Sequence, residues 1–408
     1  MSKLTYMEKL LDGVEVEWRP LEKVIHSLKT GLNPRKNFQL NTSDAQGYYV
    51  TVREIQDGKI VFLDKTDRVN DRALELINGR SNLEVGDILF SGTGTVGRTA
   101  VIEEKPANWN IKEGVYTIKP IQEKILPRFL SHLLNSSEIV KDYSKKIVGN
   151  PVVSLPMGEL KKLLIPIPCP DNPEKSLVIQ AEIVRILDAF TAMTAELTAE
   201  LNLRKKQYNY YRDQLLSFEE GEVEWKTLGD LAENLDSKRK PITSGLREAG
   251  EIPYYGASGI VDYVKDYIFD GDYLLVSEDG ANLLARNTPI AFSISGKTWV
   301  NNHAHVLKFE TYAERKYVEY YLNSIDLTPY ISGAAQPKLN KKNLESIKIP
   351  NPAPKEKERI VAILDKFDSL TCSIKEGLPR EIELRQKQYE YYRDLLLSFP
   401  KSHSDEAA

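Results

Sequence analysis

A stretch of 15 residues occurs twice in this chain with few changes. Residues 204–218 read RKKQYNYYRDQLLSF and residues 385–399 read RQKQYEYYRDLLLSF, so the copies are 181 residues apart. A repeat of this quality constrains the fold before any other feature does. Both copies are charged, apolar at helical spacing and free of glycine and proline, which favours α-helix. The chain is therefore predicted to consist of two related halves, each with such a helix.

The composition is that of a globular protein with two to four domains: 408 residues, 41% apolar and 28% charged. The net charge of -4 argues against DNA binding through bulk positive charge alone, but it leaves local basic clusters open. Cys169 and Cys372 are too few for a disulfide framework or a cysteine-rich zinc site. We find no signal peptide and no membrane-spanning run, and we expect a reducing, cytoplasmic location.

Two globular regions are predicted to alternate with two helices. Runs rich in β-branched and aromatic residues predict strands at 48–52, 59–63, 87–90 and 99–102, and at 273–276, 290–294 and 305–309. Helices are expected at 127–134 and 314–324. The proline-rich exits LLIPIPCPDNPEK and IKIPNPAPKEKE argue against helix and central strand there. The fold class is α/β (α+β).

The two long helices are expected at 177–217 and 356–398. In the first, Ile179, Ile183, Ile186, Phe190, Met193 and Leu197 alternate steps of four and three, which is a coiled-coil seam. The second has its seam from Ile360 to Leu370 and breaks near Gly377 and Pro379. We expect an antiparallel pair, each helix roughly 60 Å long.

The repeat is also predicted to be cyclic, because YMEKLLDGVEVEW at the start resembles YYRDQLLSFEEGEVEW at 210–225. A pseudo-twofold molecule would follow. The predicted regions are an N-terminal segment packed beside the C-terminal helix (1–13), a first globular domain (14–170), a central helix (171–218), a second globular domain (219–354), a C-terminal helix (355–400) and a disordered tail (401–408).

These features together resemble the specificity (S) subunit of type I restriction-modification enzymes. The resemblance rests on the twin QYxYYRDxLLSF helices, the twin VEW openings, the IPIPCPDNPEKS exit and the TAELTAEL repeat. The last two, with GLPREIELRQKQYEYYRD, resemble the IC subfamily in particular. The match covers the chain and is weakest inside the globular regions.

The resemblance implies a non-catalytic subunit in host defence. Each globular region would be a target recognition domain that reads one half of a split double-stranded DNA site. Two modification subunits would methylate adenine with S-adenosylmethionine, and two restriction subunits would cut with ATP and Mg²⁺. DNA-mimicking antirestriction proteins are further expected partners. No cofactor or metal is expected on this chain. A helical scaffold protein without DNA specificity is the alternative, and an autonomous enzyme is a third class that lacks its motifs.

The tandem TAEL units are predicted to set the distance between half-sites. They comprise Thr194, Ala195, Glu196 and Leu197, followed by Thr198, Ala199, Glu200 and Leu201. One unit adds roughly 6 Å to a helix and rotates the next part of the helix by about 40°. The alternative is that TAEL is simply a good helix former.

Two patterns suggest other chemistry only weakly. Residues 92–97 match G-x-G-x-x-G, but the following RTAVIEE predicts a strand, whereas a dinucleotide site needs a helix there. His303 and His305 share one face of a predicted strand without further metal ligands nearby. Neither pattern predicts a cofactor or metal site, and no adenine-methyltransferase motif is present.

Basic clusters, a glycine-rich turn and aromatic residues in predicted loops indicate DNA contacts, because Arg and Lys bind phosphate and polar side chains read base edges. Solvated loops are the alternative. The candidates are Lys29, Arg35, Lys36, Arg53, Thr93, Thr95 and Arg98 in the first domain, and Lys238, Arg239, Lys240, Arg247, Tyr255, Ser258, Arg286, His303, His305 and Lys338 in the second.

The repeated helix carries more aromatic residues than one partner helix can cover. Some are expected to meet another protein, because tyrosine and arginine are enriched at interface cores. Core packing is the alternative. The candidates for subunit docking are Tyr208, Tyr211, Arg212, Tyr389, Tyr392 and Arg393.

Overall fold

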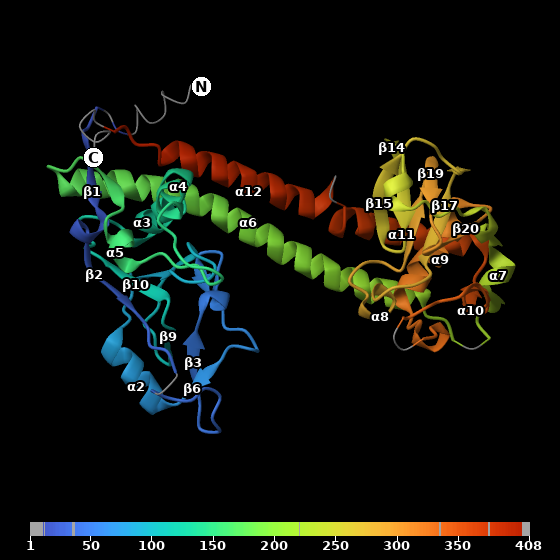
Figure 1. Cartoon of the computed structure of the whole chain (residues 1–408), viewed down its shortest axis with the longest axis horizontal. Coiled ribbons are helices and arrows are strands. Elements are labelled where there is room, and N and C mark those ends of the chain that lie inside the picture. The colour runs from blue at the N-terminus through green and yellow to red at the C-terminus, as the bar shows by residue number, and fades with distance from the viewer. Residues whose placement is uncertain are drawn as a thin grey trace. The chain divides into compact units, whose positions relative to one another are not determined.

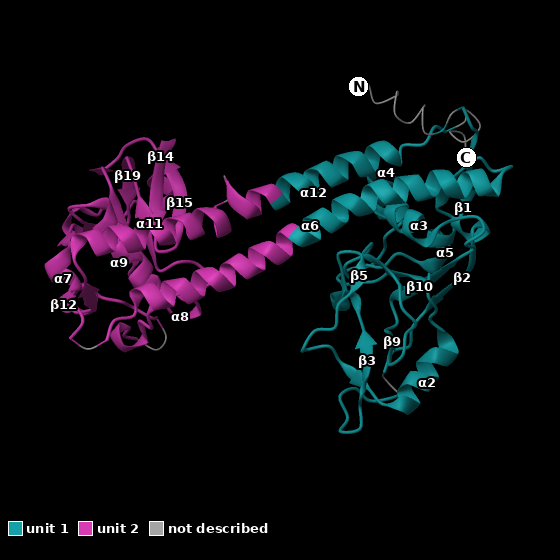
Figure 2. Ribbon diagram, turned by 180° about the vertical axis from the view of Figure 1, so that it is seen from behind, with its two compact units in different colours: residues 1–196, 382–408 teal, residues 197–381 magenta. Residues whose placement is uncertain are grey.

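The computed structural model of the chain divides into two units (Figures 1 and 2). Unit 1 comprises residues 1–196 and 382–408, and unit 2 comprises residues 197–381. The structure describes residues 11, 13–34, 37–219, 221–333, 336–373 and 376–401. Each unit holds one of the two predicted globular domains together with parts of the long helices.

The domain of unit 1 is built on a four-stranded antiparallel sheet in the order β2-β10-β7-β8. Its strands are β2 (Ile25–Thr30), β10 (Val115–Pro120), β7 (Ile88–Ser91) and β8 (Thr99–Val101). All four residues of β7 are buried, as the apolar run ILFS predicts for a strand covered on both faces. Helix α3 (Pro127–Leu134) places Phe129, Leu130 and Leu133 in the same core.

The domain of unit 2 repeats this sheet in the order β13-β20-β17-β18. Its strands are β13 (Glu233–Asn234), β20 (Ala304–Lys308), β17 (Tyr273–Ser277) and β18 (Ala291–Ile294). Helix α9 (Tyr312–Ser324) follows β20 as α3 follows β10, and Tyr317 and Leu322 are fully buried in its core. Equal strand order and equal helix placement indicate a duplicated domain.

Each domain carries a second sheet that contains one parallel strand pair. In unit 1 the order is β6-β3-β9, and in unit 2 it is β15-β14-β19-β16. The bounds are β3 (Gly47–Val50), β6 (Arg68–Val69), β9 (Trp109–Ile111), β14 (Ala249–Gly256), β15 (Gly259–Val264), β16 (Phe269–Asp270) and β19 (Lys297–Val300). Smaller elements are η1 (Leu21–Lys23), η2 (Val52–Glu54), β4 (Ile55–Gln56), β5 (Lys59–Ile60), α2 (Asp71–Arg80), α4 (Ser137–Ser144), α5 (Met157–Lys161), α7 (Leu228–Leu231), η3 (Asp236–Lys238), η4 (Ser244–Leu246), α8 (Asn282–Ala285), η5 (Thr328–Tyr330) and α10 (Lys341–Glu345).

The proline-rich exits form strands of two-stranded sheets. Strand β11 (Leu164–Pro168) pairs with β1 (Val16–Pro20), and β21 (Lys348–Asn351) pairs with β12 (Glu224–Thr227). Proline is tolerated there because an edge strand can leave the N–H side unpaired. The prediction that the exits exclude helix is wrong at their ends. Helices begin at Pro173 and Pro354, where the first turn needs no backbone N–H donor.

The long helices are α6 (Pro173–Leu216), α11 (Pro354–Thr371) and α12 (Gly377–Leu396). Within unit 1, α12 packs on the first half of α6, and Phe190 stacks on Tyr392 with 5.1 Å between ring centroids. Within unit 2, α11 packs on the second half of α6, where Phe367 stacks on Tyr211 at 5.6 Å. Both pairings run antiparallel, as predicted (Figure 1).

The seam of α6 differs from the predicted coiled coil in its middle. Ile179, Ile183 and Leu187 are buried in the core of unit 1, but Met193 is 42% exposed. No residue from 194 to 201 is buried. The first part of the apolar seam therefore packs into the core of the unit 1 domain. The TAEL repeats form a stretch of helix without buried side chains.

The N-terminal segment predicted to pack beside the C-terminal helix lies mostly outside the described residues. Leu11 shares the core of unit 1 with Leu396, Leu397 and Phe399. The indole Nε1 of Trp18 donates to the carbonyl oxygen of Pro400 at 3.0 Å. These contacts join the beginning and the end of the described chain within unit 1.

Candidate nucleic-acid interfaces

Loops gather at one end of the central sheet in each domain, held by equivalent backbone bonds. In unit 1, Gly92 N donates to Gly114 O and Leu155 N donates to Gly92 O, both at 2.8 Å. In unit 2, Glu278 N donates to His303 O at 2.9 Å and Leu339 N donates to Glu278 O at 2.7 Å. We call these loops the loop end: residues 31–34, 92–98, 112–114 and 148–155 in unit 1, and residues 236–240, 278–280, 301–303, 332–333 and 336–339 in unit 2.

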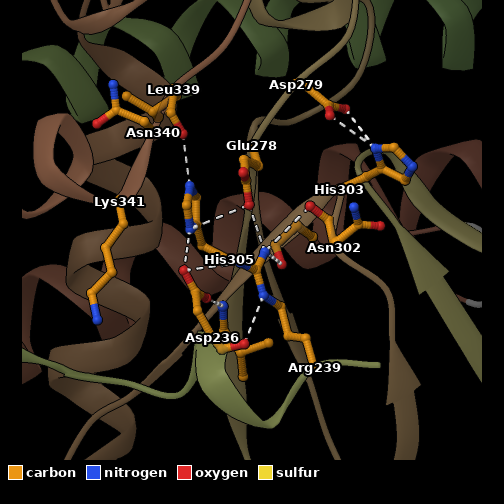
Figure 3. A network of polar contacts seen from close by, with 12 residues as sticks. Asp236, Arg239, Glu278, Asp279, Asn302, His303, His305, Leu339, Asn340 and Lys341 are labelled. Carbon is orange, nitrogen blue, oxygen red and sulfur yellow. Dashed lines mark hydrogen bonds and ion pairs between the residues drawn. The ribbon is translucent and has the colours of Figure 1, made fainter. Parts of the chain in front are cut away.

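The loop end of unit 2 is built on a buried ionic network (Figure 3). The His305 ring is fully buried between strand and loops, with Nδ1 2.6 Å from Asp236 Oδ2 and Nε2 2.7 Å from the carbonyl oxygen of Leu339. A carboxylate and a carbonyl both accept, so each ring nitrogen of His305 faces an acceptor of the protein itself. Arg239 donates to Glu278 at 2.6 Å, and Lys338 lies 3.0 Å from the same carboxylate.

The electrostatics of this network keep both carboxylates ionised. Burial by itself raises the pKa of Asp236, but the hydrogen bond and charge of His305 outweigh it, so the pKa lies below its usual value. Burial also raises the pKa of Glu278, and its bonds from Arg239 and Lys338 bring it below normal. Buried charges of both signs therefore stabilise each other here.

Asp236, Glu278 and His305 place three potential metal ligands within 4.8 Å of one another. The cluster already holds its own cations, however, because Arg239 and Lys338 neutralise the carboxylates. Both ring nitrogens of His305 already lie within hydrogen-bond distance of protein acceptors, so neither is free for a metal ion. The arrangement is that of an ion-pair network.

In unit 1, neutral side chains occupy the positions that the ionic network occupies in unit 2. Tyr116 stands where unit 2 has His305, and its hydroxyl donates to Leu155 O at 2.7 Å. Thr30 stands where unit 2 has Asp236, and its hydroxyl accepts from Gly114 N at 3.0 Å. Gly92 replaces Glu278, because a Cβ at that position would overlap the ring of Tyr116. The loop ends thus share their backbone and differ in their chemistry.

A cleft of about 620 Å³ opens at the loop end of unit 1. Polar side chains line it, among them Asn33, Thr51 and Arg53 from one side and Lys112 and Glu113 from the other. The Arg53 side chain is 52% exposed and pairs with Asp67 at 3.2 Å. This mixture of exposed donors and acceptors suits recognition of a polar ligand.

Comparison with known proteins identifies the family. A family model described as the type I restriction modification DNA specificity domain matches residues 14–204 and again residues 220–384. The chain belongs to this family. It is 40% identical to the Escherichia coli type I restriction enzyme EcoR124I/EcoR124II specificity subunit, over 98% of both chains. It is 36% identical to the EcoprrI specificity subunit of Escherichia coli, over 92% of this chain and 93% of that one.

Solved structures share the fold of this specificity subunit. The S subunit of a type I restriction-modification system from M. genitalium matches with a TM-score of 0.57 and 16% identity, over 96% of this chain and 98% of that one. A chain from a study of complex assembly and conformational transition of the type I R-M system matches with a TM-score of 0.55 and 17% identity, over 94% and 97%. Membership of the specificity-subunit family implies a non-catalytic role in DNA recognition.

Several predicted DNA contacts of the specificity subunit are exposed at the loop ends. Thr95, Lys238, Lys240, His303 and Lys338 are exposed, and Thr93 is half-buried beside the cleft. Lys29 is exposed at the end of β2, and Ser258 is exposed in the turn between β14 and β15. Arg35 and Lys36 lie outside the described residues.

Other predicted contacts are committed to the protein itself. The prediction that His305 contacts DNA is wrong, because its ring is fully buried in the network and cannot reach a ligand. Arg239 is only 12% exposed and binds Glu278, so it supports the loops from within. Arg247 pairs with Asp262 at 3.0 Å and lies over the ring of Tyr254.

Three further candidates have structural partners as well. The guanidinium of Arg98 donates to the carbonyl oxygens of Val52 and Ile55, although the residue is exposed. Arg286, in a left-handed conformation with φ 50°, donates to Asn323 O. Tyr255 is half-buried against Phe292, and burial raises the pKa of its hydroxyl.

Sequence reasoning missed the turn that precedes the central strand of each domain. Lys112 and Glu113 precede β10, and Asn302 precedes β20, and all three are exposed. Aligning VYTIKP with AHVLKF as equivalent central strands would have revealed these positions, since it places 112–114 opposite 301–303. The alignment is too short and divergent to find without the paired strands.

The predicted docking residues divide into inward and outward groups. Tyr208 and Tyr389 are half-buried, and Arg212 and Arg393 are 22% and 13% exposed, so these four pack within their own units. Tyr211 and Tyr392 are 46% and 39% exposed. The most exposed tyrosines, both at 61%, are the unselected Tyr210 and Tyr391.

The two copies of the repeated helix make similar internal contacts. Arg212 lies over the ring of Tyr208 at 5.8 Å, and Arg393 lies over that of Tyr389 at 5.7 Å. His132 of α3 contacts both Asp188 and Tyr389, while Tyr320 of α9 contacts Asp365.

Among the described residues, no helix is long and apolar enough to cross a membrane.

Proposed function

We propose that the chain is the DNA-reading subunit of a type I restriction-modification complex and that each domain reads one half of a bipartite, asymmetric site. The observation that carries this proposal is one scaffold used twice with different chemistry at its loop end. Glycine, tyrosine and threonine occupy positions 92, 116 and 30, whereas Glu278, His305 and Asp236 occupy the equivalents. Two different readers on one chain suit a site with two different halves.

The chemical steps belong to partner subunits in this proposal. Two modification subunits methylate adenine with S-adenosylmethionine, and two restriction subunits cut DNA with ATP and Mg²⁺. The chain supplies binding and register for both reactions, and DNA-mimicking antirestriction proteins compete for its loop ends. The assembly works in the cytoplasm, on double-stranded DNA.

Each copy of the repeated helix docks one modification subunit. The support is that Tyr210 and Tyr391 are exposed at equivalent positions, each in edge contact with Tyr211 or Tyr392. Tyrosine is frequent at interface cores. Tyr210→Ala should leave one modification subunit bound, and Tyr210→Ala with Tyr391→Ala should leave none, by native mass spectrometry. Two bound subunits on the double variant would contradict this role.

The TAEL repeats set the separation of the two half-sites. Their support is a solvated helical stretch in which no residue from 194 to 201 is buried, so that length can change without loss of core. A third TAEL unit adds roughly 6 Å, which is about two base-pair steps. The methylated motif should gain spacer length while its half-sites stay the same. An unchanged spacer would sink this assignment.

Binding assays separate DNA recognition from a scaffold role. The chain with its modification subunit should shift a duplex carrying the methylated motif at salt concentrations that abolish binding to a scrambled duplex. Equal affinity for both duplexes, or none for either, would favour a scaffold without sequence specificity.

A further inference from the structure

The turn before the central strand stands out at each loop end because it carries exposed side chains, some of which have no partner in the described part of the chain. Asn302 is exposed, and within the described part of the chain no hydrogen bond or ion pair involves its side-chain amide. Lys112 and Glu113 occupy the equivalent turn in unit 1 and line its cleft. Their side chains likewise form neither bond with any described residue.

The backbone of the unit 2 turn is fixed from beneath by the buried network. Arg239 donates to the carbonyl oxygens of Asn302 and Ala304 at 3.4 and 2.8 Å. His303 N donates to Asn301 Oδ1 at 2.8 Å, which closes the turn. Figure 3 shows Asn302 and His303 projecting from this supported segment. Free side chains on a rigid backbone are what precise recognition requires.

The unit 1 turn is fixed by a different set of bonds. Lys112 N donates to Val50 O at 2.8 Å, and Gly114 N donates to Thr30 Oγ1 at 3.0 Å. Gly31 closes over this turn, since a Cβ there would overlap the backbone of Ile111. Both turns therefore hold exposed polar side chains at a defined place at the loop end of the central sheet.

The chemistry of these side chains matches base edges in the major groove. An asparagine amide pairs with both N6 and N7 of adenine, a glutamate accepts from N4 of cytosine, and a lysine donates to guanine. His303 is oriented by Asp279, whose carboxylate lies 2.9 Å from Nδ1, and its side chain is 51% exposed. The orientation of one ring nitrogen by a carboxylate fixes what the other presents.

The charge around the unit 2 turn favours a nucleic-acid ligand. In the network, Arg239 and Lys338 offset the carboxylates of Asp236 and Glu278. Lys238 and Lys240 are exposed on the adjoining loop. Phosphate oxygens on either side of a read base would meet these lysines.

We propose that this turn is the specificity-determining element of each domain: Asn302 and His303 read one half-site, and Lys112 and Glu113 read the other. The inference rests on the proposed function and deepens it, because it names the element that selects the sequence. If each turn reads one half-site, substitutions in one turn change the specificity for that half-site alone.

The test is the methylation map of cells that produce the full chain with its modification subunit. Asn302→Ala should relax one base pair in one half-site, with discrimination falling by about 5- to 150-fold, and leave the other half-site unchanged. Glu113→Gln should do the same in the opposite half-site. Glu123 lies beyond the other end of β10, and Lys308 is the last residue of β20. Both are exposed, so Glu123→Gln and Lys308→Ala serve as controls and should change nothing.

The outcomes separate this inference from the proposed function. A wild-type map with no bipartite motif would overturn the proposed function itself. A bipartite wild-type motif that both Asn302→Ala and Glu113→Gln leave unaltered would overturn the turn assignment alone. Unfolding is checked by melting temperature, which should stay at the wild-type value because both side chains are exposed. A uniform loss of methylation without relaxed specificity would also count against the turns.

Discussion

The two recognition domains differ at the position where the central strand meets the loop end. In unit 1 a tyrosine, a glycine and a threonine satisfy this position with neutral hydrogen bonds. In unit 2 a histidine, a glutamate and an aspartate occupy it, and the two carboxylates are paired with Arg239 and Lys338. The backbone bonds around both solutions are the same. The scaffold therefore specifies where the loops go, and the side chains beneath them can change as a set.

The three residues of one domain cannot be exchanged one at a time for their equivalents in the other domain. The ring of Tyr116 fills the space that a Cβ at position 92 would need, so the tyrosine requires a glycine. In unit 2 Glu278 needs cations, since an unpaired buried carboxylate is strongly destabilising. Divergence of the two domains therefore had to pass through coupled changes, which double-mutant measurements can detect.

The largest expected effect comes from breaking the ionic set. His305→Ala leaves the buried carboxylate of Asp236 without its hydrogen-bond partner at 2.6 Å and should destabilise domain 2 by about 3–5 kcal/mol. Hydrogen exchange of the β17 and β20 amides measures this domain by itself. The matched change in unit 1, Tyr116→Phe, removes one hydroxyl bond and should cost about 1 kcal/mol. Equal losses in the two domains would contradict the comparison.

The neutral set transplanted into unit 2 should rescue that loss. The triple variant Asp236→Thr, Glu278→Gly and His305→Tyr carries the unit 1 residues at all three positions. Replacing a buried ionic cluster by well-packed neutral groups is often close to neutral, so its domain 2 should lie within about 2 kcal/mol of wild type. A triple variant less stable than His305→Ala would show that the sets are not equivalent.

A smaller effect is expected at the glycine of unit 1. Gly92→Ala brings a methyl group into the ring of Tyr116 and should cost about 1–3 kcal/mol, measured through the melting temperature. Gly79→Ala is the matched control, because it lies in helix α2 with open space around its Cβ. It should be neutral or stabilising by about 0.5–1 kcal/mol. A harmless Gly92→Ala would refute the steric coupling.

The smallest effect is a difference in acid sensitivity. The pKa values of Asp236 and Glu278 lie below their usual values in the folded chain. Their stabilisation is present above the unfolded pKa, near 4, and is lost as the pH falls through the lower folded values. Wild-type domain 2 should therefore lose stability, relative to the neutral triple variant, as the pH falls through this window. Parallel pH profiles of exchange would contradict this.

The duplication and the helices could be predicted from the sequence because they rest on local patterns. The twin helical stretches, the break at Gly377 and helix α3 at 127–134 all appear where their spacing and residue types place them. The strand at 59–63 is shortened to Lys59–Ile60, because the following residues leave the sheet. Helix α6 begins earlier than its apolar spacing predicts, at Pro173, because proline is favourable in the first turn of a helix.

The candidate site could be predicted only in part, because a sequence does not show which side of a strand faces a loop. Basic clusters found Lys238 and Lys240 at the loop end of unit 2. The same reasoning selected His305, whose burial follows from its place opposite Asp236 and Leu339, far away in the sequence. It overlooked Asn302, because an isolated asparagine in a turn carries no signal without its neighbours in space.

The most direct test of the central claim is the methylation map of a genome exposed to the wild-type chain and its modification subunit. Two domains with different loop-end chemistry predict one motif made of two different half-sites, separated by a fixed number of unread base pairs, with adenine methylated in each half. A single continuous motif, a palindromic pair of half-sites or the absence of any motif would contradict the account.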